Sequence, residues 1–283
     1  MEEFTIAIYC FFDDLLQKLD PMPIDKRRKL TDAQVITTAT LAAKYFYGNQ
    51  ASACGYLKAH YGFEIPHKSN FNRILHQLTD LIADVFFQLG LIFKHLNLSS
   101  SYIIDSFPVP ICKNIRIKRS KLLQGKEYHG FNASKRDYFY GVKVHMIVTS
   151  DGIPVEFLVT PGSIHDNTGL QAMTVDLPSS SDLYGDSAYV NQEQKEWLAS
   201  EGIRLKAATK KNLLIRNTWA EELENKYYRK RVENTFADLT AKFPKKIHAV
   251  TSKGLLLKIL FYVIMIMMDR RFKFEMQQMG LKE

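Results

Sequence analysis

The stretch Ser101-Tyr-Ile-Ile-Asp105-Ser-Phe-Pro-Val-Pro110 gives the clearest local signal in the chain. The apolar run before Asp105 favours β-structure, and Pro108 and Pro110 disfavour regular structure soon after it. We therefore predict a short buried strand that ends at Asp105. A carboxylate in that position is costly unless it is paired or binds a cation, although an aspartate can also simply cap a turn.

Charge is distributed unevenly along the 283 residues. Residues 1–100 hold ten Lys/Arg and ten Asp/Glu, whereas residues 101–283 hold 28 Lys/Arg and 20 Asp/Glu and carry the whole net charge of +8. A basic half beside a neutral half indicates that residues 101–283 meet a polyanion, although a merely basic protein has the same composition.

The remaining composition indicates a folded cytoplasmic protein. Three widely separated cysteines fit a reducing compartment, and no signal peptide is recognised at the N-terminus. The most apolar stretch, Leu255 to Met268, contains Lys258 and is shorter than the ~20 residues of a membrane span. No membrane association is expected.

Residues 1–97 are predicted to form an all-helical domain. Apolar residues recur at helical spacing in residues 2–19, 31–47, 51–60 and 71–96, the last with an interruption near Gly90. Ser52 to Leu78 could be a DNA-binding helix-turn-helix, and the alternative is a helical packing or oligomerisation domain. In the first case these side chains would face the bases: Lys68, Asn70, Asn72, Arg73 and Gln77.

A basic insert, residues 111–138, follows the predicted strand. Its cations are Lys113, Arg116, Lys118, Arg119, Lys121, Lys126, Lys135 and Arg136, and the aromatic Tyr128, His129, Phe131 and Tyr138 are interleaved. Cations bind phosphates and aromatic rings stack on exposed bases, so a DNA-facing role is favoured over a solvated loop.

Two more carboxylates occur at the ends of predicted elements. A hairpin over residues 140–159 precedes a helix in which Asp166 is expected to act as the N-terminal cap. Asp186 then ends a short strand, and Glu233 lies on a helix from about Ala220 to Lys242, at the margin of an apolar stripe. Glu233 could equally form a surface pair with Arg229.

Asp105, Asp186 and Glu233 suit one chemistry. Carboxylate oxygens are the ligands that Mg²⁺ and Mn²⁺ prefer, and two such ions are the usual device for in-line phosphodiester chemistry. The sequence contains no His/Cys zinc pattern, P-loop or G-x-S-x-G elbow.

Several long motifs resemble the DDE transposases of bacterial insertion sequences, most closely the nine-eight-two group. They are IIDSFPVPICKNIRIKRSK, ASKRDYFYGVKVHMIVTSDGIPVEFLVTPGS, YGDSAY and YRKRVENTF…FPKKIHAVT, in this order over residues 101–255. The resemblance implies an RNase H-like α/β catalytic core, a mixed sheet with flanking helices, over residues 98–283. It also implies catalytic and metal-binding roles for Asp105, Asp186 and Glu233, Mg²⁺ as cofactor and element DNA as substrate.

The helix around Glu233 departs from a signature of related transposases, Y-x2-R-x3-E-x6-K. Arg229 and Glu233 fit, but Lys226 stands in the tyrosine position beside Tyr227 and Tyr228, and Thr240 stands in the lysine position with Lys242 nearby. The residues expected to contact DNA are Arg116, Lys118, Arg119, Arg229, Arg231 and Lys242.

The expected function is therefore DNA transposition in a bacterial cytoplasm, near the nucleoid. The protein would cleave double-stranded DNA at the terminal inverted repeats and join the 3′-hydroxyl to target DNA. A homodimer is expected in the DNA complex because two ends must be held together. The alternatives are an RNase H-like nuclease without strand transfer and an inactive DNA-binding relic of a transposase.

Overall fold

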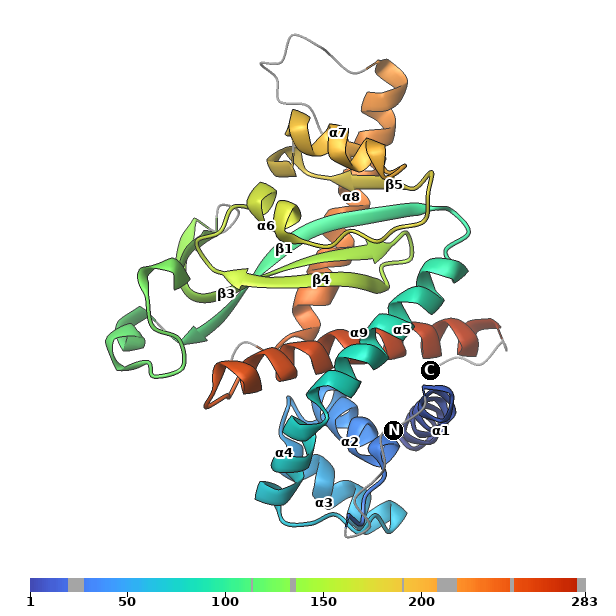
Figure 1. The fold of residues 1–283 in the computed structure, drawn as a ribbon, viewed down its shortest axis with the longest axis vertical. Helices are drawn as coiled ribbons and strands as arrows, with labels where there is room; N and C mark the ends of the chain where they lie inside the picture. The colour runs from blue at the N-terminus through green and yellow to red at the C-terminus, as the bar shows by residue number, and fades with distance from the viewer. Residues whose placement is uncertain are drawn as a thin grey trace. The chain divides into compact units, whose positions relative to one another are not determined.

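The computed structural model describes residues 1–19, 28–112, 114–132, 136–189, 191–207, 218–244 and 247–278. The chain forms two compact units, one of Met1–Leu89 with Ile247–Glu283 and one of Gly90–Lys246 (Figure 1). Across the described ranges, no helix combines the length and apolar character needed to cross a bilayer.

The first unit is helical, as predicted. Its helices are α1 (Glu2–Lys18), α2 (Asp32–Tyr45), α3 (Gln50–Tyr61), α4 (Lys68–Gln77), most of α5 (Thr79–Leu96) and α9 (Ser252–Gln278). Helix α2 is buried along most of its length and contacts α1, α3, α4 and α9. It begins with a capping box between Thr31 and Gln34, and Asn49 caps α3, which satisfies backbone N–H groups at both helix starts.

Helix α9 is tied to α1 and α2 by polar and aromatic contacts. Lys44 of α2 forms an ion pair with the buried Asp269 of α9, and its ammonium also lies 3.9 Å from the centre of the Phe4 ring of α1. Phe4 packs edge-on against Phe272, with ring centres 5.3 Å apart. The C-terminal helix therefore completes the core of this unit, although it is far from α1 and α2 in sequence.

The helical region predicted over residues 71–96 is broken at a different place. The structure separates α4 and α5 at Leu78, and α5 runs without interruption through Gly90. A Cβ on Gly90 would lie 2.8 Å from the carbonyl oxygen of Val155. Glycine at this position allows α5 to approach β4 closely, and the helix continues past it.

The second unit contains a six-stranded mixed sheet. Its strands are β1 (Ser101–Cys112), β2 (His129–Asn132), β3 (Asp137–Thr149), β4 (Pro154–Pro161), β5 (Asp182–Gly185) and β6 (Arg204–Ala207). β3 is antiparallel to β1, β2 and β4, whereas β5 is parallel to β1 and β6. The order of the main strands is β4-β3-β1-β5-β6, with β2 beside the other end of β3.

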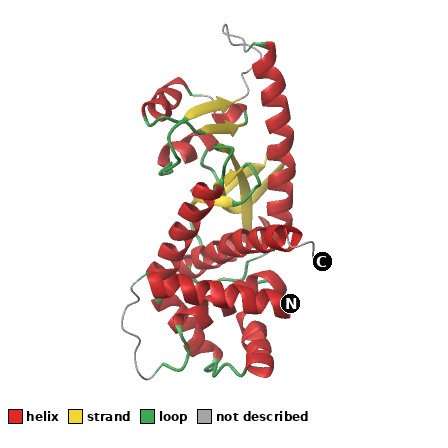
Figure 2. Cartoon of the chain, turned by 90° about the vertical axis from the view of Figure 1, so that its right-hand side faces the viewer, coloured by secondary structure: helices red, strands yellow, loops and turns green. Residues whose placement is uncertain are grey.

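Three helices flank this sheet: α6 (Asp166–Ala172), α7 (Gln192–Ser200) and α8 (Trp219–Lys242). Helix α8 covers one face, and α6 and α7 lie on the other (Figures 1 and 2). The predicted apolar stripe of α8 is confirmed, since Val232, Phe236 and Leu239 are all buried. A mixed sheet with flanking helices, preceded by helices, confirms the predicted fold class.

Strand β1 is longer than predicted. It continues through Pro108 and Pro110, which pair with Lys143 and Gly141 of β3. Residues two apart in a strand direct their backbone N–H groups to the same edge. Pro108 and Pro110 therefore both leave the same edge of β1 without a donor. The pairing with β5 covers only residues 101–103, so no ladder hydrogen bond is lost on that edge.

Candidate active site on two neighbouring parallel strands

Asp105 and Asp186 occupy equivalent positions on neighbouring parallel strands. The register pairs Ser101 with Asp182 and Ile103 with Tyr184. The same offset, continued by two residues, matches Asp105 with Asp186. Neighbouring strands lie about 4.8 Å apart, so this register brings the two backbones close together.

Both carboxylates lie on the side of the sheet that α8 covers. Phe107, two residues after Asp105, packs against Phe236 and Phe243, with ring centres 6.4 Å and 5.0 Å apart. Tyr184, two residues before Asp186, also packs against α8. Because side chains alternate along a strand, Asp105 shares the face of Phe107, while Ser106 points to the opposite face.

The environment of Asp105 disfavours a negative charge. Burial raises the pKa of its carboxyl from 3.8 to about 7, and the charges of Asp186 and Asp166 raise it further, while the Ser106 N–H and Lys143 act in the opposite sense. The Ser106 N–H donates to Asp105 Oδ1 at 2.7 Å. A buried carboxyl near two other acids is ionised at a cost, which a bound cation would reduce.

Tyr189, just after Asp186, is fully buried near the same acids. Its pKa is raised by burial first, and then by the charges of Asp105, Asp166 and Asp186. The hydroxyl has no hydrogen-bond partner among the described residues. Ser106 lies near enough to lower this pKa slightly, but no hydrogen bond of normal geometry joins the two hydroxyls.

The expected use of Asp166 as a helix cap is wrong. The N-cap of α6 is His165, whose side chain caps nothing, and Asp166 is the first helical residue. Its Oδ1 accepts hydrogen bonds from Ser106 Oγ at 2.5 Å and from Lys143 Nζ at 3.1 Å. Asp166 therefore joins α6 to the residue next to Asp105, a contact that local sequence cannot reveal.

His145 lies behind this contact in the sheet. Burial lowers the pKa of its imidazole to about 4, so the ring is neutral at pH 7, and Nε2 lies 2.9 Å from Thr160 Oγ1. A Cβ on Gly169 would lie 2.2 Å from the ring, so glycine allows α6 to pack directly on the histidine. These contacts fix α6, and thereby Asp166, against β3.

Glu233 is exposed on α8, three residues before Phe236. The described residues contain no group of three or more His, Cys, Asp or Glu side chains arranged to hold a metal ion. The register places Asp105 beside Asp186, while Asp166 holds Ser106 on the opposite face of the sheet and acts on Asp105 through its charge. Glu233 lies on the helix that covers the face of Asp105.

The residues expected to contact DNA lie on two elements. Arg116, Lys118 and Arg119 are exposed on the 3₁₀ helix Asn114–Arg119 of the insert. On α8, Arg231 lies 3.5 Å from Asp151 and Lys242 lies 3.5 Å from Asp238. Lys113, Lys135 and the side chain of Arg229 lie outside the described residues.

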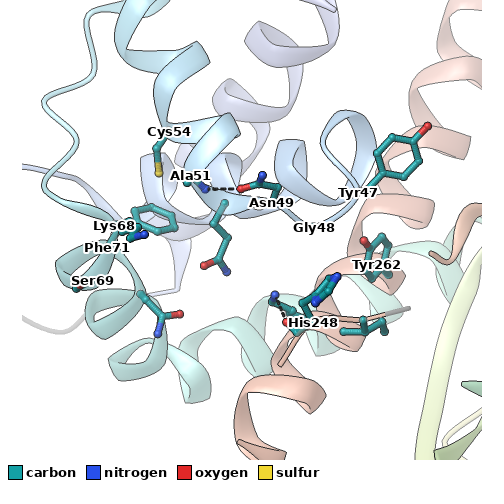
Figure 3. A pocket seen from close by; sticks show the side chains of 14 residues that line it. Tyr47, Gly48, Asn49, Ala51, Cys54, Lys68, Ser69, Phe71, His248 and Tyr262 are labelled. Carbon is teal, nitrogen blue, oxygen red and sulfur yellow. Dashed lines mark hydrogen bonds between the residues drawn. The ribbon is translucent and has the colours of Figure 1, made fainter. Parts of the chain in front are cut away.

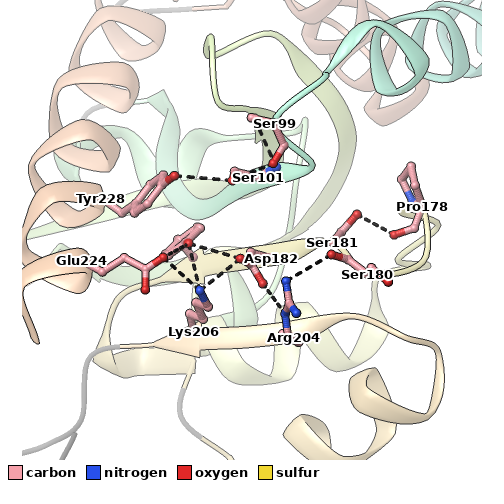
Figure 4. A network of polar contacts seen from close by, with 11 residues as sticks. Ser99, Ser101, Pro178, Ser180, Ser181, Asp182, Arg204, Lys206, Glu224 and Tyr228 are labelled. Atoms are coloured by element: carbon pink, nitrogen blue, oxygen red, sulfur yellow. Dashed lines mark hydrogen bonds and ion pairs between the residues drawn. The ribbon is translucent and has the colours of Figure 1, made fainter. Parts of the chain in front are cut away.

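The start of α8 is attached to β5 and β6 by a polar and aromatic cluster (Figure 4). Tyr228 stacks on Tyr184 with ring centres 3.6 Å apart, and Tyr184 donates a hydrogen bond to Glu224 at 2.6 Å. Lys206 lies 2.9 Å from Glu224 and 3.0 Å from Asp182. The cluster holds the start of α8 over β5 and β6.

Residues 97–248 match the protein family described as transposase DDE domain. A search of curated proteins finds no significant match. Among solved structures, the cryo-EM structure of the piggyBac transposase synaptic complex with hairpin DNA aligns with a TM-score of 0.43 and 10% identity. This alignment covers 99% of this chain and 74% of the other. The family match covers more than half of the chain. The chain therefore belongs to the transposase DDE domain family.

Proposed function

We propose that this protein is a DNA transposase that cleaves phosphodiester bonds at the ends of a mobile element and joins the freed 3′-hydroxyl to target DNA. The observation that carries the proposal is the pair Asp105 and Asp186, matched across two parallel strands within a transposase DDE domain.

Asp105 and Asp186 would hold divalent cations, with Mg²⁺ as the proposed ion and Mn²⁺ as a substitute. The raised pKa of Asp105, which burial and the charges of Asp186 and Asp166 cause, supports a site that a bound cation would stabilise. When bound, such ions activate the attacking water or hydroxyl and stabilise the leaving oxygen. The chain's own carboxylates orient the ions and supply no covalent nucleophile.

Glu233 is proposed as the third acid. Its position on α8, one turn before Phe236, supports this role because Phe236 packs on Phe107, two residues after Asp105. In this proposal Glu233 completes the triad when DNA and cations are bound. Arg116, Lys118 and Arg119 would contact phosphates, and a homodimer would hold the two element ends.

Asp166→Asn is expected to lower the cleavage rate about tenfold without unfolding the protein, because Asp166 holds Ser106, the residue after Asp105, and its charge acts on the Asp105 carboxyl. The amide still accepts from Ser106 but no longer carries the charge that faces Lys143. The rate should be measured against Mg²⁺ concentration, because a weaker site needs more metal. An unchanged metal requirement would contradict the role.

The function itself is tested by a cleavage and strand-transfer assay. The substrate is duplex DNA with the ends of the element that encodes this chain, supplied with Mg²⁺ or Mn²⁺. Wild type is compared with Asp186→Asn and with Asp84→Asn, an exposed carboxylate on α5. Metal-dependent cutting and joining, lost only in Asp186→Asn, is the expected result.

Two results would replace the proposal with one of its alternatives. Cutting without joining would indicate an RNase H-like nuclease. Sequence-selective binding with no cutting by wild type would indicate a DNA-binding relic.

A further inference from the structure

Two surface cavities in the first unit adjoin one another. The first, about 520 Å³, lies between the start of α3, the start of α4 and residues 247–262 (Figure 3). The second, about 750 Å³, lies between α4 and residues 248–258. Both are lined by Gln50, Asn72, His248 and Lys258, so they form one continuous cleft, which we call the α4–α9 cleft.

The cleft is positively charged in a unit that is nearly neutral. Met1–Leu89 and Ile247–Glu283 contain fifteen Lys/Arg and thirteen Asp/Glu. The described residues that line the cleft include no Asp or Glu, and its cations are Lys68, Arg73, Lys253 and Lys258. The basic lining is thus specific to this surface and does not follow from the charge of the whole unit.

Its uncharged groups suit an anion as well. The starts of α3 and α9 contribute Asn49, Gln50, Thr251 and Gly254 to the lining, and the start of α4 contributes Ser69. Asn49 and Thr251 already cap the starts of α3 and α9, so these starts contribute a partial positive charge together with side-chain amide and hydroxyl groups. These features add to the side-chain cations at the same surface.

We propose that the α4–α9 cleft binds the phosphate backbone of duplex DNA. The inference rests on the proposed function, because it gives the transposase a DNA contact outside the sheet that carries Asp105 and Asp186. Three exposed cations, Lys68, Arg73 and Lys253, and several neutral donors along two adjoining cavities match a run of phosphates on a strand. A single small anion would occupy only a fraction of this space.

Phosphate contact differs from the base readout expected of a helix-turn-helix. Arg73, Asn72 and Gln77 line the cleft, whose opposite wall is the segment from His248 to Lys258. A helix that reads bases must present this face to a major groove. Because these side chains face a basic wall instead, we assign them to backbone contacts.

The decisive variant is Arg73→Ala/Lys253→Ala in the full-length protein. Both side chains are exposed on opposite walls of the cleft, so the change should not disturb folding. The matched control is Lys18→Ala/Lys58→Ala, which removes two exposed charges of the same unit outside the cleft. Duplex affinity is measured in EDTA, over a range of salt concentrations and with both element-end and scrambled sequences.

We expect the cleft variant to bind roughly tenfold more weakly than the control variant on both sequences. The slope of log affinity against log salt should fall by about two, near one for each lost phosphate contact. Bound duplex should also protect Lys68 and Lys253 from acetylation, with Lys18 and Lys58 still reactive.

Equal affinity of the cleft and control variants would overturn the inference. So would a loss confined to element-end DNA, which would indicate base readout. If wild type still cleaves element ends in either case, the proposed function survives. Protection of the cleft in a wild-type protein that never cleaves would support the cleft and contradict the transposase activity.

Discussion

Asp105→Asn is expected to lower DNA cleavage by about 10³-fold or more, in line with the loss of a group that stabilises developing charge. The same change should make the metal-free protein more stable at neutral pH. The reason is that Asp105 is held beside Asp186 and Asp166 in a partly buried position, and its pKa is raised to about 7. Asparagine keeps the shape of the side chain and removes the charge.

The pH dependence of this gain follows from the sign of the shift. Between about pH 4 and pH 7 the folded protein binds a proton at Asp105 that the unfolded chain has lost. The stabilisation from that proton is complete below the ordinary pKa and disappears as pH rises through 7. Asp105→Asn should therefore match wild type near pH 4 and exceed it by about 2 kcal/mol near pH 8, a value reduced for partial exposure.

Denaturant unfolding in EDTA at pH 4 and pH 8 measures this difference, with Asp84→Asn as the control. Adding Mg²⁺ should raise the stability of wild type and leave Asp105→Asn unchanged, because only wild type retains the full cation site. If the variant gained no stability at pH 8 and still responded to Mg²⁺, Asp105 would not belong to a cation site.

Lys94→Met is expected to cost about 3 kcal/mol of unfolding free energy, in the range found when one partner of a buried ion pair is removed. The Lys94 side chain is 5% exposed, forms an ion pair with Glu156 of β4, and lies 3.3 Å from Asp176. Without Lys94 the partly buried Glu156 lacks its compensating charge. Burial already raises the pKa of Glu156 and Lys94 lowers it, so the loss should be larger at pH 8 than at pH 5.

The double variant Lys94→Met/Glu156→Met tests whether the loss of stability comes from the unpaired Glu156 charge or from lost packing. It should recover most of the stability, because an apolar pair of similar volume replaces the ion pair. Lys195→Met, an exposed lysine on α7, should change stability little. Equal losses in the single and double variants would show that packing, and not charge, explains the effect.

Much of the fold could be predicted from local patterns. Helices α1, α2, α3 and α8 and the hairpin of β3 and β4 follow from periodicity, caps and the Asp151-Gly152 turn. The continuation of β1 through Pro108 could not, because it depends on which edge of the strand is unpaired. The packing of α9 against α1 and α2 likewise depends on tertiary contacts. The predicted boundary between a helical domain (residues 1–97) and a catalytic domain (residues 98–283) stays a prediction.

The candidate site could be predicted in part. Asp105 and Asp186 could be found because each follows a short apolar run, and the register then brings them together. The contact from Asp166 to Ser106 and the burial of Tyr189 arise only when α6 and residues 187–189 pack beside β1. The role of Glu233 stays a prediction, since its helix is positioned by Phe236 and Tyr228 while its own side chain remains exposed.

The parallel pairing of β1 with β5 has a consequence for the order of folding. β3 and β4 are joined by a short turn, whereas the residues that pair in β1 and β5, such as Ser101 and Asp182, are separated by about 80 residues of chain. Closing such a long loop lowers the entropy of the chain before the contacts between β1 and β5 can stabilise it. This pairing should therefore form late in folding. Asp105 and Asp186 would then meet only after the rate-limiting step. Mg²⁺ should accordingly slow unfolding and leave the refolding rate unchanged.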